Sequence, residues 1–186
     1  MYGVRTKRPA CLPKRQPESA VSGQYEPLWA RPEDLQIAVE GEPWLVGGEA
    51  PRIHADGIAL DRDGGWLYYQ ALSGTTLYRV PAALLRDAGV PAEELAAAVE
   101  QVAAVGPSDG LLHGPDGAVY LTSLERNAIR RVWPGSGAVE TVVQDPRISW
   151  PDSCALGPDG RLHFTTAQIH RGPSPPEPYR LFRIDP

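Results

Sequence analysis

Three recurring aspartates are the residues of this chain best suited to chemistry. Asp56, Asp109 and Asp152 each open a short apolar run, and they recur at intervals of about 40 to 50 residues. Carboxylates gathered around one polar mouth suit a hard divalent cation, which prefers oxygen ligands. Alternatively, each aspartate caps its own loop by accepting hydrogen bonds from nearby backbone N–H groups. Because the residue recurs in every copy, the sequence leaves both interpretations open.

The segments around these aspartates form a repeat. In each copy an Asp-Gly pair follows the leading aspartate, and glycine tolerates the positive φ that a tight turn requires. The pairs are Asp63-Gly64, Asp116-Gly117 and Asp159-Gly160, and an apolar run follows each of them. A period of about 40 to 50 residues built from short strands is typical of a β-propeller, with one repeat per blade.

The repeats predict an all-β fold, a partial β-propeller of about three blades with one short helix. We expect the blades near residues 54–105, 107–146 and 150–186, the last without an outermost strand. Pro91 and the alanine- and glutamate-rich residues after it predict the helix, near residues 91–103.

Composition separates the beginning of the chain from the rest and excludes several kinds of partner. Residues 1–32 are basic and proline-rich and predict a disordered or irregular leader, whereas residues 33–186 form the propeller. The net charge of −5 argues against a nucleic-acid partner. We expect no secretory signal and no membrane span. Cys11 and Cys154 have neither metal-ligand spacing nor a disulfide framework.

Propeller geometry predicts where the aspartates meet. Residues that precede the innermost strands surround one mouth of the central channel, so Asp56, Asp109 and Asp152 are expected on the same rim. His54 and His113 lie near leading aspartates in the sequence and are expected to join this ligand-binding site. A bound metal would be calcium-like, and Asp109 is a weak candidate for a catalytic base.

Several segments carry a resemblance to a known family. They are residues 55–60, 66–72, 77–81, 108–110, 124–129, 143–152 and 178–184. Together they resemble the bacterial form of the major royal jelly protein/Yellow family from about Glu33 onward. The resemblance implies a six-bladed propeller, distantly similar to the gluconolactonase/senescence-marker-protein lactonases. Members are linked to melanin-pathway chemistry or to binding small amines in the channel, and many are secreted, which implies a secreted or periplasmic location.

The resemblance also implies a role for part of the site. Family members are about twice this long, so this chain is similar to their C-terminal half. In the lactonases a glutamate, an asparagine opening one blade and an aspartate opening the next hold the metal. The blade-opening pair falls on Asp56 and Asp109, and the glutamate belongs to blades that this chain lacks.

Three functions remain open from the sequence. The first is small-molecule binding in the central channel, and the second is a metal-dependent, lactonase-like hydrolase that uses Asp109. The third is a truncated product that either has no activity of its own or works only as an assembly. Three blades would leave two apolar flanks open, so two copies are expected to form a homodimer through these flanks.

Overall fold

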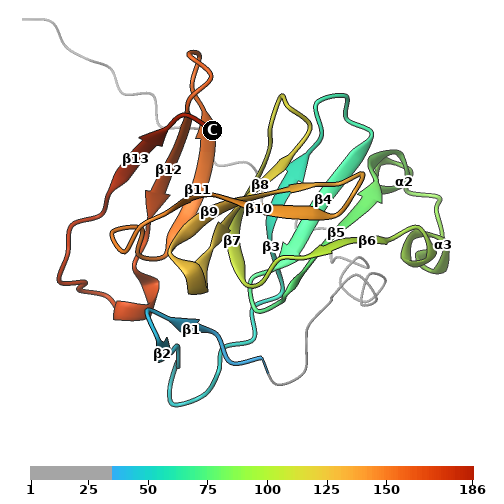
Figure 1. The fold of residues 1–186 in the computed structure, drawn as a ribbon. Coiled ribbons are helices and arrows are strands. Elements are labelled where there is room, and N and C mark those ends of the chain that lie inside the picture. Colours follow the sequence, from blue (N-terminus) through green and yellow to red (C-terminus); the bar gives the residue numbers. More distant parts are fainter. Residues whose placement is uncertain (1–34) are drawn as a thin grey trace, which may run out of the picture.

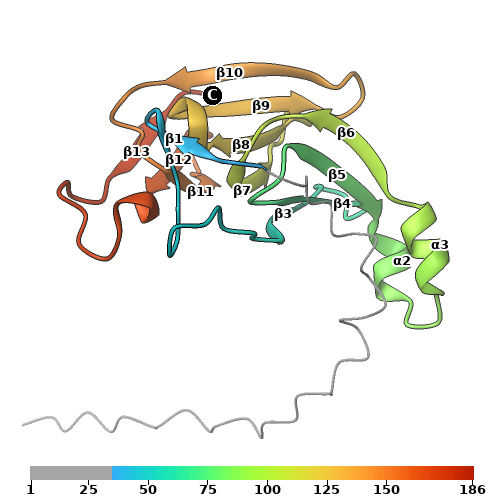
Figure 2. The same cartoon turned by 90° about the horizontal axis from the view of Figure 1, so that it is seen from below.

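Three antiparallel sheets stand side by side as consecutive propeller blades (Figure 1). This computed structural model describes residues 35–186, so the expected leader, residues 1–32, lies outside the described residues. The all-β partial propeller expected from the repeats is confirmed. Viewed at right angles, the blades form an arc, with their first strands on its inner side (Figure 2).

Each blade follows the order of the chain. Blade one consists of β3 (Ala55–Leu60), β4 (Trp66–Ala71), β5 (Thr76–Pro81) and β6 (Glu100–Ala104). Blade two consists of β7 (Ser108–His113), β8 (Val119–Ser123), β9 (Ala128–Trp133) and β10 (Ala138–Gln144). Blade three consists of β11 (Pro151–Leu156), β12 (Leu162–Thr166) and β13 (Leu181–Ile184). Within the described residues, it has no fourth strand.

The repeated Asp-Gly pairs form the turns between the first two strands of each blade. Gly64, Gly117 and Gly160 have φ values of 70°, 85° and 76°, a region that side-chain-bearing residues rarely adopt. The aspartates of the second and third turns also accept a hydrogen bond from a backbone N–H two residues later. The turns predicted at the three Asp-Gly pairs are therefore confirmed.

Apolar side chains from adjacent blades pack together between the sheets. Between blades one and two, the buried residues are Ala59, Tyr68, Leu77, Val105, Leu111, Val119, Leu121 and Val132. Between blades two and three, they are Ala118, Tyr120, Ile129, Ile148, Leu162 and Phe164. Each blade therefore depends on its neighbour for a core, as expected for a repeat that cannot bury its apolar faces alone.

Helical structure in blade one differs from the expectation. There are two short α-helices, α2 (Ala82–Arg86) and α3 (Ala92–Ala97), and residues 100–104 form the strand β6. The expected helix over residues 91–103 is therefore wrong beyond Ala97, because the chain pairs with β5 from Glu100 onward. Leu95 of α3 packs against Tyr69 and Val80, so the helices cover part of this blade's outer face.

The segment that precedes blade one crosses one end of the arc. It includes a small ribbon of β1 (Ala38–Val39) and β2 (Glu42–Pro43), seen below the sheets in Figure 1. Its buried residues Ile37, Val39 and Trp44 contact a cluster with Leu72, Leu124 and Trp150. Two single 3₁₀ turns, η2 (Leu124–Arg126) and η3 (Ile169–Arg171), lie in the loops of blades two and three. No helix among residues 35–186 is long and apolar enough to cross a bilayer.

Candidate functional site

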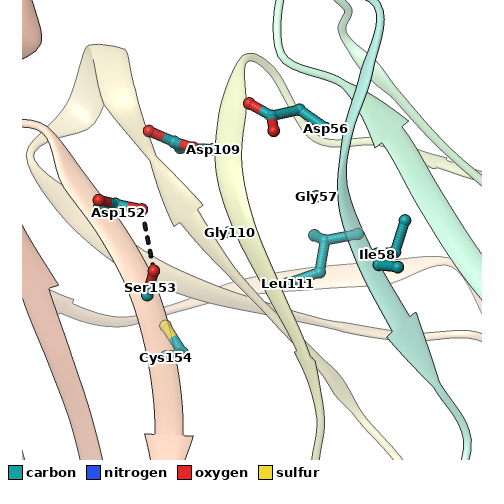
Figure 3. Close-up of a pocket in the computed structure, with 9 residues that line it drawn as sticks. All are labelled: Asp56, Gly57, Ile58, Asp109, Gly110, Leu111, Asp152, Ser153 and Cys154. Carbon is teal, nitrogen blue, oxygen red and sulfur yellow. Dashed lines mark hydrogen bonds between the residues drawn. The ribbon is translucent and has the colours of Figure 1, made fainter. Parts of the chain in front are cut away.

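The three leading aspartates line one hollow on the inner side of the arc. Its volume is about 360 Å³, and each innermost strand contributes three consecutive residues to its wall. In Figure 3 the carboxylates lie toward one end, and Ile58, Leu111 and Cys154 lie further along the strands. The lining residues are Asp56, Gly57, Ile58, Asp109, Gly110, Leu111, Asp152, Ser153 and Cys154.

The repeat places each aspartate at the same point of its blade. Asp56, Asp109 and Asp152 are the second residues of β3, β7 and β11. These strands contact one another in sequence order along the arc, β3 with β7 and β7 with β11. Three residues that are far apart in the chain thus meet at one rim, as the propeller geometry predicts.

Glycine after the first two aspartates permits this close approach of the strands. A Cβ on Gly57 would lie 2.8 Å from the carbonyl oxygen of Asp109, and one on Gly110 would lie 2.0 Å from that of Asp152. Real Cβ atoms do not approach so closely. The third copy has Ser153 at this position, and no further blade of the described residues packs beside it. The glycines therefore have a packing role that the sequence repeat alone did not reveal.

The carboxylates of the hollow are not loop caps. Within residues 35–186, the hydrogen bonds that we observe to Asp109 and Asp152 come from side chains, not from backbone N–H groups. The indole N–H of Trp150 donates to Asp109 over 2.7 Å, and the Ser153 hydroxyl donates to Asp152 over 2.9 Å. None of the three aspartates forms an ion pair with a cation of the described residues. Within the described part of the chain, the rim of the hollow is therefore acidic.

Trp150 supports the rim from behind. Its side chain is wholly buried, and its φ of 49° lies in the left-handed region, which is rare for a bulky residue. Its ring meets Trp44 edge-on at 4.6 Å and stacks on His170 at 5.7 Å. His170 in turn contacts Glu40, which also accepts a 2.7 Å hydrogen bond from Arg171. The aromatic contacts hold the indole N–H against the Asp109 carboxylate.

The electrostatics of the hollow raise the pKa values of Asp109 and Asp56. Burial raises the pKa of Asp109 to about 6, the hydrogen bond from Trp150 opposes this rise, and the charges of Asp152 and Asp56 add to it. Burial and the charge of Asp152 also raise the pKa of Asp56, whereas a hydrogen bond with Asp109 lowers it. Asp109 therefore exchanges its proton closer to neutral pH than an ordinary aspartate does.

The two histidines expected at this rim have different positions. His54 directly precedes β3, where its carbonyl accepts a hydrogen bond from Leu72, next to the rim. His113 is the last residue of β7, stacks on Tyr68 and lines a second hollow with Leu60 and Leu156. The expectation that His113 lies beside the aspartates is wrong, because the strand carries it to the opposite end of the blade.

The described residues do not form a complete metal site. Among residues 35–186, no group of three or more His, Cys, Asp or Glu side chains is arranged to hold a metal ion. Asp56 and Asp109 alone supply two carboxylates, fewer than the ligands that calcium takes. Burial and the charge of Asp152 raise the pKa of the nearby Cys154 thiol to about 12, so this thiol is protonated at neutral pH.

Sequence reasoning missed the residues behind the rim. Trp44 and Trp150 belong to this group, together with Glu40, His170 and Arg171. Trp150 stands two residues before a leading aspartate, and this position is the one signal that could have drawn attention to it. Its positive φ and its bond to Asp109 depend on tertiary packing, which no repeat pattern shows.

Comparison with known proteins agrees with this architecture. The chain is similar in fold to a gluconolactonase of Xanthomonas campestris, with 14% identity and a TM-score of 0.55, over 73% of this chain and 44% of that one. It is also similar to a candidate gluconolactonase, with 16% identity and a TM-score of 0.52, over 85% of this chain and 54% of that one. The chain spans about half the length of these solved structures, and identities this low concern the fold alone.

Sequence comparison identifies the family. No curated protein matches the chain in sequence. The profile of the family described as Major royal jelly protein matches residues 44–153, which include all three leading aspartates and all of blades one and two. This match covers more than half of the 186 residues. The chain belongs to the Major royal jelly protein family.

Proposed function

We propose that this protein binds a small cationic molecule, an amine with an apolar group, in the three-aspartate hollow. The observation that carries the proposal is the set of three carboxylates on one rim, with no ion pair to any cation of residues 35–186. An organic ammonium group placed there would donate charge-assisted hydrogen bonds to more than one carboxylate. The family resemblance, which implies binding of small amines in the channel, supports the same class of ligand.

The wall of the hollow supports the apolar part of this ligand. Beyond the carboxylates, Ile58, Leu111 and Cys154 present apolar surface toward the same space (Figure 3). Ligand pockets are commonly lined by apolar side chains, with a few polar groups that fix the orientation. An arylalkyl amine would place its ammonium group at the rim and its ring against these side chains.

Calorimetric titration with a matched pair of ligands tests this proposal. Phenethylamine is cationic at neutral pH, and 2-phenylethanol is a neutral molecule of nearly the same shape. We expect phenethylamine to bind and 2-phenylethanol not to bind. Added salt should weaken the binding, because salt screens exposed charges. Equal heats for the two compounds would show that the carboxylates do not select a cation.

A pair of Asp→Asn variants locates the binding. Asp109→Asn should weaken phenethylamine binding roughly tenfold, about 1.4 kcal/mol, since it removes one carboxylate from the rim. Asp63→Asn is the matched control, because Asp63 is an exposed residue of the first Asp-Gly turn, away from the hollow. The proposal requires that Asp63→Asn bind as the wild type does.

A lactonase-like hydrolase is the second candidate, and the pKa of Asp109 favours it. A carboxyl with a pKa of about 6 suits a general base near neutral pH. If the protein is such a hydrolase, Asp109 takes a proton from the water that attacks the lactone carbonyl. A metal-dependent form would need a further ligand besides Asp56 and Asp109. Hydrolysis of gluconolactone by the wild type and not by Asp109→Asn, with and without added calcium, would support this candidate.

A further inference from the structure

A buried tryptophan stands behind the acidic rim in a backbone conformation that costs free energy. Trp150 has a φ of 49°, and strained conformations of this kind persist only where the surroundings impose them. Its exposed fraction is 0%, so it cannot touch a ligand in the hollow. Any influence on that ligand must pass through a neighbouring residue.

Asp109 is the residue of the hollow to which Trp150 is hydrogen-bonded. The Trp150 indole N–H donates to one carboxylate oxygen of Asp109 over 2.7 Å, which is short for a nitrogen donor. Asp109 lines the hollow, and the bond joins the loop that leads into blade three to the innermost strand of blade two. One oxygen of Asp109 is thus engaged from behind, and the orientation of the carboxyl group is fixed.

Trp150 directly precedes β11. Pro151 begins that strand, and Asp152 directly after it lines the same hollow as Asp109. The Trp150 carbonyl accepts a 2.9 Å hydrogen bond from the N–H of Ala167, in the loop after β12. The backbone of Trp150 is therefore tied to blade three, and its side chain is tied to blade two.

Ring contacts on two sides fix the indole itself. Trp44 meets it edge-on at 4.6 Å, and His170 stacks on it with an angle of 8° between the ring planes. With its rotamer held from both sides, the indole has little freedom to leave Asp109. Locked rotamers of this kind are how supporting residues hold a binding group in place.

We propose that Trp150 is a positioning residue of the acidic hollow, which sets the orientation of Asp109 and its placement relative to Asp152. The relevance of this role to ligand binding rests on the proposed function. The bond to Asp109 can be tested without any ligand, so the two ideas fail in different experiments.

The first experiment observes the indole directly. In a ¹H–¹⁵N spectrum of the full chain, the indole resonance that is lost in Trp150→Phe identifies Trp150. Asp109→Asn should move this resonance upfield, because a charged acceptor is replaced by a neutral one. Asp152→Asn should leave it nearly unchanged. A Trp150 indole resonance that does not respond to Asp109→Asn overturns the proposal. Assigning that resonance through the backbone resonances of the wild type makes the comparison independent of whether Trp150→Phe folds.

The second experiment uses phenethylamine as the probe. Trp150→Phe keeps an aromatic ring and removes the N–H, and we expect it to weaken binding roughly tenfold, as loss of a hydrogen bond to a charged group does. Trp133→Phe is the matched control, because it also removes an indole N–H that donates to a carboxylate, that of Glu140, and neither residue lines the hollow. It should bind within about twofold of the wild type. Equal losses in the two variants would show that the effect of Trp150→Phe does not pass through Asp109 and would overturn the proposal. If the wild type does not bind while the indole responds to Asp109, the proposed function fails and the positioning of Asp109 stands.

Discussion

A Cβ atom on Gly110 would lie only 2.0 Å from the carbonyl oxygen of Asp152. This approach joins the innermost strands of blades two and three, and a backbone oxygen cannot move aside as a flexible side chain can. Gly110→Ala should therefore lower the free energy of unfolding by about 3 kcal/mol, the upper end for overpacking, in urea denaturation. Gly135→Ala is the control, because nothing lies within 4 Å of a Cβ there. Similar losses in both variants would contradict the packing role of Gly110.

Asp109 should give the free energy of unfolding a pH dependence of a definite sign. Burial first, and then the charges of Asp152 and Asp56, raise its pKa from 3.8 to about 6. The folded protein therefore binds this proton more tightly than the unfolded chain. The stabilisation is complete below pH 3.8 and is lost as the pH rises through 6. Asp109→Asn should gain stability relative to the wild type between pH 4 and pH 7, as measured by urea unfolding. A constant difference across this range would exclude the raised pKa.

Glu40 should give the free energy of unfolding a pH dependence of the opposite sign. Burial alone would raise its pKa, but hydrogen bonds from neighbouring side chains, including Arg171, lower it from 4.5 to about 2. The stabilisation is present above pH 4.5 and is lost as the pH falls toward 2. Glu40→Gln should lower the melting temperature at pH 7, and this deficit should shrink as the pH falls below 4.5. Glu42→Gln, an exposed residue of the adjacent strand β2, should show no such deficit.

The flanks of the arc predict weak self-association. The side chains of Ile58 and Leu60 on β3 are 61% and 50% exposed, whereas Leu111, the counterpart of Ile58 in blade two, is buried against blade one at 9%. We propose that two copies pair through these flanks, and we expect a concentration-dependent dimer of the 20.2 kDa chain in sedimentation equilibrium. Ile58→Asp should shift the equilibrium to the monomer. A wild type that stays monomeric at all concentrations would contradict the pairing.

A second variant distinguishes the geometry of that pairing. If two copies rebuild a ring, blade three of one copy packs beside blade one of the other, and Ser153 occupies the position where the internal joints have glycine. Ser153→Gly should then tighten the dimer. If blade one of each copy packs against blade one of the other, Ser153→Gly should have no effect, because Ser153 lies on β11 of blade three.

The propeller and the rim of aspartates could be predicted because both depend on local signals that repeat. The Asp-Gly turns and the apolar runs after them fix where the strands begin, and the equal offset of each aspartate fixes its place in the blade. The strand β6 could not be predicted in this way. Residues 100–104 follow an alanine-rich helix, and they become a strand only because the edge of β5 is available to them.

The errors at the site have a similar cause. His113 is close to Asp109 in sequence, but an extended strand advances about 3.3 Å per residue and separates them along the blade. Trp150 is distant from Asp109 in sequence and bonded to it in the fold. Residues that are close in sequence can lie at opposite ends of a strand, and contacts between blades leave no local pattern in the sequence.

The crossing segment that carries Trp44 has a mechanical consequence. Through Ile37, Val39 and Trp44 it clusters with Leu72, Leu124 and Trp150, which lie at the same end of the three blades. The blades of an open arc can move apart, and a segment that packs across one end of the arc restrains only that end. Thermal spreading should therefore be smaller where the aspartates lie than where His113 lies. The rim of the proposed binding site therefore lies at the restrained end of the arc, and we expect the larger motion at the opposite end.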